Sequence, residues 1–327
     1  MRRREFIFLT GGVAAAWPFF AHAQQPAVHV VAMLNGQSAE GYSRLAEAVR
    51  LGLKDEGFVD GQNVSIEYRW AAGRDEQLPA MAVELVNRHV AVLLTGGSTW
   101  ATISAKAATA TIPIVFTTAS DPIKLGYVAS LNRPGGNVTG VSFLGAQLVA
   151  KRLELASQLV SKEVVIGFLG RPREPRYAAD RKVIESAAAA VGRKILFLDI
   201  ADERELESAF AAANREHVGV LIPLNDPFFN SHRGALVDLA ARHSLPTIYE
   251  SREPVADGGL MSYGTSIKDA YRQVGVYAGR ILKGEKASDL PVVQSTRFEL
   301  VINLKTAKTL GLSIPRDLLV AADEVIE

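Results

Sequence analysis

The sequence predicts an α/β fold of two lobes, each built on a doubly wound, Rossmann-like parallel sheet and joined to the other by a hinge. Short runs rich in Val, Ile, Leu and Phe alternate with helical patterns along the whole chain. Most of these runs are apolar at consecutive positions, which is typical of strands buried on both faces of a parallel sheet. The 327 residues also exceed what one hydrophobic core usually holds, which favours two lobes.

The expected strands recur along the chain with helices between them. In chain order they cover residues 28–34, 64–70, 90–94, 112–117, 138–143, 164–169, 195–200, 218–224, 247–250 and 260–263. The segments between the strands have the apolar periodicity of helices. In the helix expected over residues 42–56, for example, Leu45, Val49 and Leu53 recur every fourth position on one face. A strand followed by a helix, many times over, predicts right-handed crossovers between parallel strands.

The two halves of the chain repeat one arrangement. Tyr42 opens a helix whose terminating Gly57 comes 15 residues later, before the strand sequence VSIEYRW. Tyr177 opens another helix whose Gly192 also comes 15 residues later, before ILFLDI. A duplicated lobe explains this spacing, and a single wide Rossmann-type sheet is the alternative that the sequence leaves open. The break between the two lobes is predicted near residues 143–145, where a strand gives way to the pattern of a helix.

Residues 1–23 have the pattern of an export signal. A cationic start is followed by an apolar run over residues 6–20 and by AHA at 21–23, the A-x-A spacing after which a signal peptidase cuts. The sequence RREFI at residues 3–7 resembles the twin-arginine pattern, with the Sec pathway as the alternative. The chain has no cysteine, so it offers no residue for a lipid anchor. We therefore expect cleavage after Ala23 and a periplasmic protein without a lipid anchor.

The overall charge argues against a nucleic acid or an anionic membrane as partner, because 36 basic residues nearly balance 35 acidic ones. We expect a small-molecule ligand and a monomeric chain. No phosphate-binding P-loop and no G-x-S-x-G nucleophile motif occurs, and no cysteine is present to act as a nucleophile. The six histidines are scattered without metal-ligand spacing. The sequence therefore predicts no catalytic residue, no metal site and no cofactor.

Ligands of open α/β sheets collect at the carboxyl ends of the strands, where loops and helix N-termini offer free N–H groups. In the first half, small polar residues follow the first, third and fourth expected strands. Plain helix capping is the alternative role for each of them. The candidate ligand-binding residues of this half are Asn35, Ser38, Gly97, Ser98, Thr117, Ser120 and Asp121.

The corresponding loops of the second half place aromatic residues beside acids and amides. Asp226 or Glu250 could bind an ammonium group, and helix N-termini of the first half could bind a carboxylate. The candidate ligand-binding residues here are Asn225, Asp226, Phe228, Tyr249, Glu250 and Tyr263, with the aromatic ones expected against an apolar side chain. Phe229 is expected in the core, and Arg171 and Arg173 on a solvated rim.

Three stretches resemble the substrate-binding proteins of ABC importers, in the tryptophan/phenylalanine-binding-like family. They are IPIVFTTASDP at 112–122, LNRPGGNVTG at 131–140 and FELVINLKTAK at 298–308. The resemblance runs through nearly the whole chain after the export signal. It implies a type I periplasmic-binding fold that traps a ligand between two lobes joined by a hinge and delivers it to a membrane permease. Members are known or thought to bind amino acids, aromatic ones in some cases.

In the type I periplasmic-binding fold the chain crosses between the lobes three times. This places the second crossing at 264–266 and the third near 291–298, with a helix over residues 269–282 returning the chain to the first lobe. The first lobe then holds residues 24–143 and about 265–290, and the second holds 144–264 and about 291–327.

Some alternatives stay open beside this resemblance. Relatives often read S-P-G where this chain has NGQS at residues 35–38, which leaves the identity of the ligand open. A periplasmic sensor subunit for a membrane kinase would share every feature described. An exported α/β hydrolase is a weaker alternative, because no histidine lies in the candidate loops. A regulator of the LacI type would need a helix-turn-helix where this chain has its export signal.

Overall fold

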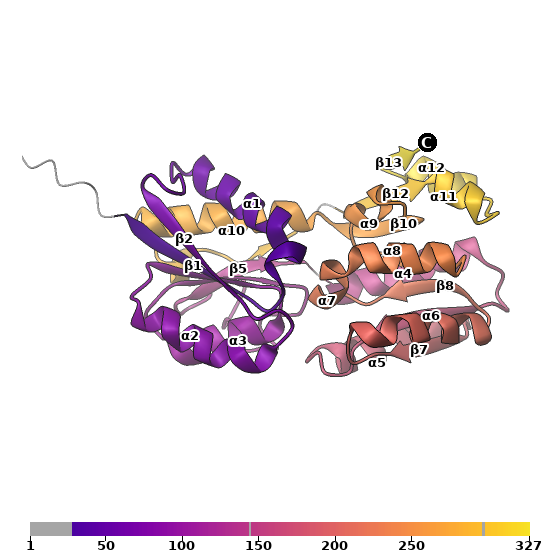
Figure 1. The fold of residues 1–327 in the computed structure, drawn as a ribbon, viewed down its shortest axis with the longest axis horizontal. Coiled ribbons are helices and arrows are strands. Elements are labelled where there is room, and N and C mark those ends of the chain that lie inside the picture. The colour runs from indigo at the N-terminus through magenta and orange to yellow at the C-terminus, as the bar shows by residue number, and fades with distance from the viewer. Residues whose placement is uncertain (1–27, 144, 296–297) are drawn as a thin grey trace, which may run out of the picture.

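The structure is a computed structural model that describes residues 28–143, 145–295 and 298–327. Two α/β lobes lie side by side, with the N-terminal strands in one and the C-terminus in the other (Figure 1). The predicted two-lobed fold is therefore confirmed, and the single wide sheet is wrong. The expected export signal at residues 1–23 lies outside the described residues.

The first lobe is built on a six-stranded sheet in which all neighbours pair in parallel. In spatial order its strands are β2 (Val64–Trp70), β1 (His29–Asn35), β3 (Val92–Gly96), β4 (Ile114–Thr118), β5 (Val138–Ser142) and β11 (Val293–Gln294). Helices α1 (Ala39–Asp55) and α10 (Ile267–Leu282) cover one face, and α2 (Leu78–Asn87) and α3 (Thr99–Ala108) cover the other (Figure 1). The sheet is thus buried on both sides, as its apolar strands predict.

The second lobe repeats this strand order. Its spatial order is β7 (Ile195–Asp199), β6 (Val165–Gly170), β8 (Val218–Pro223), β9 (Ile248–Tyr249), β10 (Met261–Thr265), β12 (Phe298–Asn303) and β13 (Glu324–Ile326). A single bridge between Leu221 and Thr247 connects β8 to the segment that leads into β9. The first five strands of each lobe therefore follow the same topology, which agrees with the repeat seen in the sequence.

Helices cover both faces of the second lobe. One face carries α4 (Gly145–Leu159), α5 (Tyr177–Val191), α11 (Leu304–Thr309) and α12 (Arg316–Ala321). The other face carries α6 (Leu206–Arg215), α8 (Arg233–Arg242) and α9 (Arg252–Ala256), with the short α7 (Pro227–Ser231) before α8. Among the described residues, no helix is both long and apolar enough to cross a membrane.

One strand departs from the predicted parallel arrangement, because β12 runs antiparallel to β10. Strand β10 ends at Thr265, where the chain leaves the second lobe for α10 of the first. Strand β12 begins at Phe298, after the chain has left β11 of the first lobe, so it enters the second lobe from the side where β10 left it. The reversal is therefore a consequence of the hinge.

The ten predicted strands all occur within two residues of their expected limits, whereas β11, β12 and β13 were not predicted as strands. Strand β11 pairs with β5 through Val293 and Val141. The first lobe consequently extends to Gln294, four residues beyond the predicted limit at about 290.

Helix α10 is held in the first lobe by close backbone contact with α1. A Cβ atom on Gly52 would lie 1.9 Å from the carbonyl oxygen of Arg272, and one on Gly275 would lie 2.1 Å from that of Val49. Both distances are far below van der Waals contact, so the two helices pack this closely only because these positions are glycine.

Candidate functional site: a closed cleft between the lobes

The carboxyl ends of the strands of both lobes face each other across a cavity of about 60 Å³. The first lobe contributes the loops after β3 and β4 and side chains from α1 and α10. The second lobe contributes α4 and the loops after β6, β8 and β9. The lining residues used below are Tyr42, Gly97, Ser98, Thr99, Thr117, Thr118, Ser120, Phe143 and Tyr271 from the first lobe and Arg152, Glu174, Arg176, Asn225, Asp226, Asn230 and Glu250 from the second.

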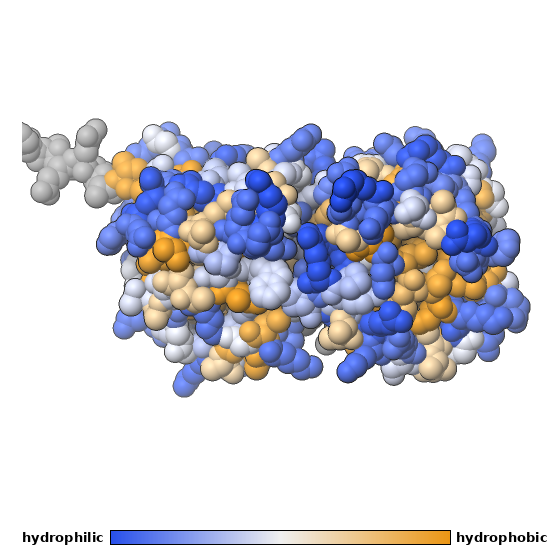
Figure 2. Space-filling model, turned by 60° about the horizontal axis from the view of Figure 1, so that its bottom comes forward, coloured by the Kyte–Doolittle hydropathy of each residue, from blue (hydrophilic) through white to orange (hydrophobic). Residues whose placement is uncertain are grey.

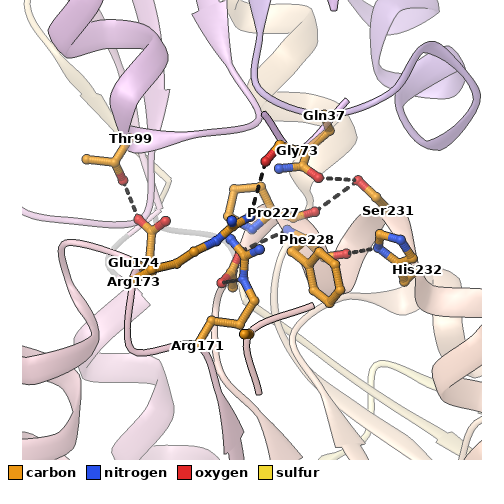
Figure 3. Close-up of polar contacts among 12 residues, drawn as sticks. Gln37, Gly73, Thr99, Arg171, Arg173, Glu174, Pro227, Phe228, Ser231 and His232 are labelled. Atoms are coloured by element: carbon orange, nitrogen blue, oxygen red, sulfur yellow. Dashed lines mark hydrogen bonds and ion pairs between the residues drawn. The ribbon is translucent and has the colours of Figure 1, made fainter. Parts of the chain in front are cut away.

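The lobes are closed, because side chains of one touch the other directly (Figure 3). The Thr99 hydroxyl donates a hydrogen bond to Glu174 Oε1 at 2.5 Å. A guanidinium nitrogen of Arg173 donates to the Gly73 carbonyl at 3.2 Å. The Ser231 hydroxyl of the second lobe donates a hydrogen bond to Gln37 Oε1 of the first lobe at 3.2 Å. In the space-filling view the lobes meet along a junction lined largely by hydrophilic residues (Figure 2).

The first-lobe loop after β3 is shaped by contacts between backbone and side chains. Gly97 has a φ angle of +68°, and a Cβ atom there would lie 1.9 Å from Asn35 Oδ1. Asn35 is fully buried and accepts a hydrogen bond from the Gln37 backbone N–H at 2.8 Å. Gln37 Nε2 in turn donates to the Gly97 carbonyl at 2.8 Å. Asn35 and Gln37 therefore fix the loop after β3 without lining the cavity themselves, and the backbone of Gly97 in that loop lines the cavity.

The helix N-terminus beside this loop is capped by Ser98. Its hydroxyl accepts a hydrogen bond from the Trp100 N–H at 3.1 Å at the start of α3. After β4, the Thr118 hydroxyl accepts one from the Ser120 N–H at 3.1 Å. The Ser120 hydroxyl is buried and has no hydrogen-bond partner among the described residues.

Two tyrosines complete the first-lobe wall. Tyr42 from α1 and Tyr271 from α10 are each 3% exposed, and their rings meet edge to face with centroids 6.0 Å apart. Burial raises the pKa of Tyr271 to about 12 and the pKa of Tyr42 well above its ordinary value. Both hydroxyls are thus neutral at physiological pH, so this wall combines aromatic surface with uncharged hydroxyl groups.

Arg152 is the most deeply buried residue of the second-lobe wall, with no exposed surface. It donates from Nε to the Tyr263 carbonyl at 2.8 Å and from Nη1 to Asn225 Oδ1 at 2.7 Å. Its Nη2 atom has no partner among the described residues. Burial lowers the pKa of Arg152 to about 10, partly offset by the nearby carboxyl group of Glu250, so it stays protonated at neutral pH.

Asp226 is already engaged within the second lobe. Its Oδ1 accepts the Phe228 N–H at 2.8 Å and caps α7, and its Oδ2 accepts Arg171 Nε at 2.6 Å. Arg171 is 2% exposed and lies over the Phe228 ring at 4.5 Å from its centroid. The prediction of a solvated Arg171 is therefore wrong, because a carboxylate and an aromatic face together compensate its burial. Arg173 is exposed, as expected, although it also reaches the first lobe.

Two glutamates of this wall have raised pKa values. Burial raises the pKa of Glu174 to about 7, with Asp226 adding to the shift and Thr99, Arg176 and Arg171 opposing it. Burial also raises the pKa of Glu250 to about 7, against the opposing effect of the Arg152 and Arg176 guanidinium groups. No hydrogen bond joins the Glu250 carboxylate to another described residue, whereas Glu174 accepts one from Thr99.

Arg176 lies beside these carboxyl groups and is 8% exposed. It is held by two hydrogen bonds to Asp180, at 2.7 and 3.0 Å. Its remaining nitrogen, Nη1, has no partner among the described residues. Arg152 and Arg176 thus each keep one buried donor open while their other nitrogens are fixed.

The structure brings about half of the predicted site residues to the cavity. Those that line it are Gly97, Ser98, Thr117, Ser120, Asn225, Asp226 and Glu250. Those that do not are Asn35, Ser38, Asp121, Phe228, Tyr249 and Tyr263.

The first-lobe residues that miss the cavity serve the local structure. Ser38 caps α1 by accepting the Gly41 N–H at 3.3 Å. Asp121 is exposed and caps a turn by accepting the N–H groups of Ile123 and Lys124. The capping alternative thus holds at both positions.

The second-lobe aromatic residues miss the cavity because they pack elsewhere. Phe228 and Tyr249 belong to the core, with Phe229, as expected for Phe229. The Tyr263 ring stacks with Phe298 at 6.2 Å between ring centroids, and only its carbonyl serves the site, through Arg152. These three rings therefore do not line the cavity, and its tyrosine rings are those of Tyr42 and Tyr271 of the first lobe.

Sequence reasoning missed the lining residues that lie on helices or in the later part of the loop after β6. These are chiefly Tyr42, Arg152, Glu174, Arg176, Asn230 and Tyr271. Arg152 offered one signal, because it interrupts the apolar face that Leu148, Leu155 and Ala156 give to α4. A cation at an apolar helical position is rarely buried without a partner.

Comparisons with known proteins agree with this geometry. The family model described as "ABC transporter substrate binding protein" matches residues 27–326. A curated relative, the tyrosine-binding protein of Clostridioides difficile strain R20291, is 27% identical over 80% of this chain and 74% of its own length.

Two crystal structures give a similar result. A conserved domain protein of Vibrio cholerae O1 biovar El Tor is 26% identical, with a TM-score of 0.83 over 91% of this chain and 99% of its own. A Streptococcus pneumoniae structure, described as an ABC domain in complex with L-Trp, is also 26% identical, with a TM-score of 0.80 over 91% of this chain and 99% of its own.

Proposed function

This chain belongs to the family of ABC transporter substrate-binding proteins, and we propose that it captures an aromatic α-amino acid between its lobes and delivers it to the permease of an ABC importer. The observation that carries the proposal is the closed cleft, in which an aromatic, uncharged wall faces a wall with both signs of charge. An aromatic amino acid offers a ring to the first wall and two opposite charges to the second.

The relatives support this ligand class. One is described as a tyrosine-binding protein, and another was solved with L-tryptophan. The cavity is lined from both lobes, which agrees with a ligand that the lobes enclose, since binding clefts bury most of a small ligand's surface. Binding without a covalent step is the proposed activity.

The delivery step follows from closure. A ligand shifts the equilibrium between open and closed forms only if it binds the closed form more tightly. A ligand that touches both walls has this property, and closure then adds contacts such as Thr99 with Glu174. We propose that the permease recognises the closed arrangement.

The site of action is part of the same proposal. The pattern of residues 1–23 supports a periplasmic protein that is cleaved after Ala23, and the absence of cysteine supports one without a lipid anchor. We also propose that it acts as a monomer. Fractionation of cells that produce the full chain tests this, and Lys substitutions at Arg3 and Arg4 test the twin-arginine route. Retention of both variants in the cytoplasm supports that route, and their normal export favours the Sec pathway.

Thermal unfolding tests the ligand class directly. The chain without residues 1–23 is heated with each of the 20 amino acids in turn. L-Trp, L-Tyr or L-Phe at 100 times its dissociation constant should stabilise the fold by about 2.7 kcal/mol, which is a shift of several degrees in Tm. L-Asp and L-Lys serve as controls of wrong side-chain chemistry. The ligand class is wrong if no aromatic amino acid shifts Tm.

Uptake tests the importer. Deleting the gene should abolish high-affinity uptake of the labelled ligand and leave uptake of an unrelated amino acid unchanged. Normal uptake by the deletion strain, together with tight binding by the purified chain, would instead indicate a sensor.

A further inference from the structure

We infer that the second lobe alone recognises both charges of the ligand, the ammonium group through Glu250 and the carboxylate through Arg152 and Arg176. The first lobe then recognises only the uncharged remainder, so the ligand docks on the second lobe before the first closes over it. This inference rests on the proposed function, because it takes the ligand to be an α-amino acid.

The first line of support is the distribution of charge around the cavity. The charged wall, as we call it, consists of the lining residues Arg152, Glu174, Arg176, Asp226 and Glu250, all from the second lobe. The neutral wall consists of the first-lobe lining residues, which are aromatic, apolar, small or hydroxyl-bearing. Full charges of a ligand find complementary full charges only on the charged wall.

The second line of support is the pair of unpartnered arginine nitrogens. Nη2 of Arg152 and Nη1 of Arg176 are buried and have no hydrogen-bond partner in the described parts of the chain. Arg171 Nη1 is also buried without a partner, but Arg171 does not line the cavity. Because buried donors are nearly always paired, the two open nitrogens on cavity-lining arginines indicate an acceptor that belongs to the ligand. Two guanidinium N–H groups match a carboxylate, which accepts several hydrogen bonds and carries the opposite charge.

The third line of support identifies the carboxylate that meets the ammonium group. Both oxygens of Asp226 are engaged, one by the Phe228 N–H and one by Arg171. Glu174 accepts the Thr99 hydroxyl in the contact between the lobes. Glu250 faces the cavity without a hydrogen bond to any described residue, so it is the acid left for the ligand. Its proximity to Arg152 and Arg176 suits a head group with adjacent opposite charges.

The order of binding follows from the way the charged wall is held together. Arg152 is fixed by Asn225 and by the Tyr263 carbonyl, and Arg176 is fixed by Asp180. All these contacts lie within the second lobe, so they do not depend on closure. The two arginines of the charged wall are therefore preformed in the open protein and, with Glu250 beside them, present the head-group site to solvent.

Three probes separate the two charges of the ligand. They are L-tryptophan, tryptamine, which lacks the carboxylate, and indole-3-propionate, which lacks the ammonium group. Calorimetric titration of each probe is carried out with the full-length mature chain and with the variants Glu250→Gln, Arg176→Lys and Ser120→Ala. Melting temperatures of the variants without ligand show that each one is folded.

Each variant should give its own pattern. Glu250→Gln should weaken L-tryptophan and tryptamine at least tenfold and change indole-3-propionate less than twofold. Arg176→Lys, which keeps the charge but removes the second Nη group, should weaken L-tryptophan and indole-3-propionate at least fivefold and spare tryptamine. Ser120→Ala on the neutral wall should weaken all three probes by a similar factor.

The outcomes that overturn the inference differ from those that overturn the proposed function. If no aromatic amino acid binds the unmodified chain, the proposed function is wrong and the inference falls with it. If L-tryptophan binds but Glu250→Gln affects all probes alike, or Ser120→Ala selectively weakens the probes that carry a carboxylate, only the inference is wrong.

Stopped-flow fluorescence tests the order of binding. Glu250→Gln should lower the association rate constant for L-tryptophan at least fivefold, because the docking site is changed. Thr99→Val should leave that rate constant within twofold and raise the dissociation rate constant, because only the closed form is changed. The reverse pattern would place docking on the first lobe.

Discussion

The two lobes share their strand order but offer opposite chemistry to the cleft. The neutral wall of the first lobe uses backbone and hydroxyl groups from the loops after β3 and β4, with Tyr42 and Tyr271 beside them. The charged wall of the second lobe uses guanidinium and carboxyl groups, and its residues Arg152, Arg176 and Asp226 are held in place by partners within the same lobe. Topology thus decides where a site forms, whereas the side chains that line it decide what it binds.

The division also affects closure. Had the first lobe carried charges of its own, closing would require removing charges of both lobes from water at once, which is costly unless all are paired. With one neutral wall, closing mainly buries aromatic and hydroxyl surface against a head group that is already bound. The asymmetry therefore allows one lobe to select the ligand and the other to enclose it.

The largest expected effect concerns the interior of the charged wall. Arg152→Met leaves the Tyr263 carbonyl and Asn225 Oδ1 without their donor, so we expect the free energy of unfolding to fall by about 3 kcal/mol. Urea denaturation measures it. Lys151→Met on the same helix is the control, because its exposed pair with Glu154 should contribute less than about 1 kcal/mol. Equal losses in both variants would contradict a structural role of Arg152.

The next effect is a pH dependence of opposite sign at two glutamates. In the closed cleft, burial places the pKa of Glu250 at about 7. Only the carboxylate form pairs with an ammonium group, so its contribution to affinity is lost as the pH falls through the pKa that Glu250 has in the open protein. Glu174 reaches a pKa of about 7 in the closed form, whereas its pKa should return toward ~4.3 when the open cleft exposes it to water. Closing then takes up a proton, so Glu174 favours binding at low pH, and this contribution is lost as the pH rises through about 7.

Single variants separate the pH dependence of affinity that is due to Glu250 from the one that is due to Glu174. In Glu174→Gln, the affinity for the aromatic amino acid should fall as the pH drops from 7.5 to 5.5, by at most about tenfold per pH unit. In Glu250→Gln, the remaining affinity should rise over the same interval. Calorimetric titration at several pH values measures both. If affinity changed with pH in the same direction in both variants, the two glutamates would not have the opposite roles described.

A smaller effect is expected at the contact between the two walls. Thr99→Val removes the hydroxyl that donates to Glu174, and one such bond contributes about 1 kcal/mol, which is about a fivefold increase in Kd. The exposed Thr111→Val, on the same lobe, should leave Kd unchanged. Closure would have to depend on other contacts if the two variants bound equally well.

The smallest effect tests the neutrality of the first lobe. Asp121 is a charged residue that the sequence places in a candidate loop, but it caps an exposed turn. Asp121→Ala should therefore cost at most about 1 kcal/mol of stability and leave affinity within twofold. A large loss of affinity would mean that the first lobe contributes a charge to the ligand after all.

The positions of the loops could be predicted from the sequence because they depend on backbone topology. Apolar runs located the strands, and the carboxyl-end rule then selected Gly97, Ser98 and Ser120, which line the cavity. The same rule selected Ser38 and Asp121, which cap helices or turns, since one residue type performs both tasks. Short polar side chains do not distinguish capping from ligand binding without coordinates.

The helical side chains of the site could not be predicted in this way. Tyr271 lies 229 positions after Tyr42 in the printed sequence, and only the return of α10 to the first lobe brings the rings together. Arg152 reaches the cavity from α4 through partners on β10 and after β8. Such contacts depend on tertiary packing, which local patterns do not encode.

The contact of Gly52 with α10 has a consequence for the order in which the protein is made. The first lobe begins at the N-terminus, yet one face of its sheet is covered by α10 and one edge is formed by β11, which ends at Gln294. During synthesis the ribosome must therefore complete most of the second lobe before the first lobe can bury its core. The lobe that is started first is finished almost last, so its half-covered sheet must be kept from aggregating while the rest of the chain emerges.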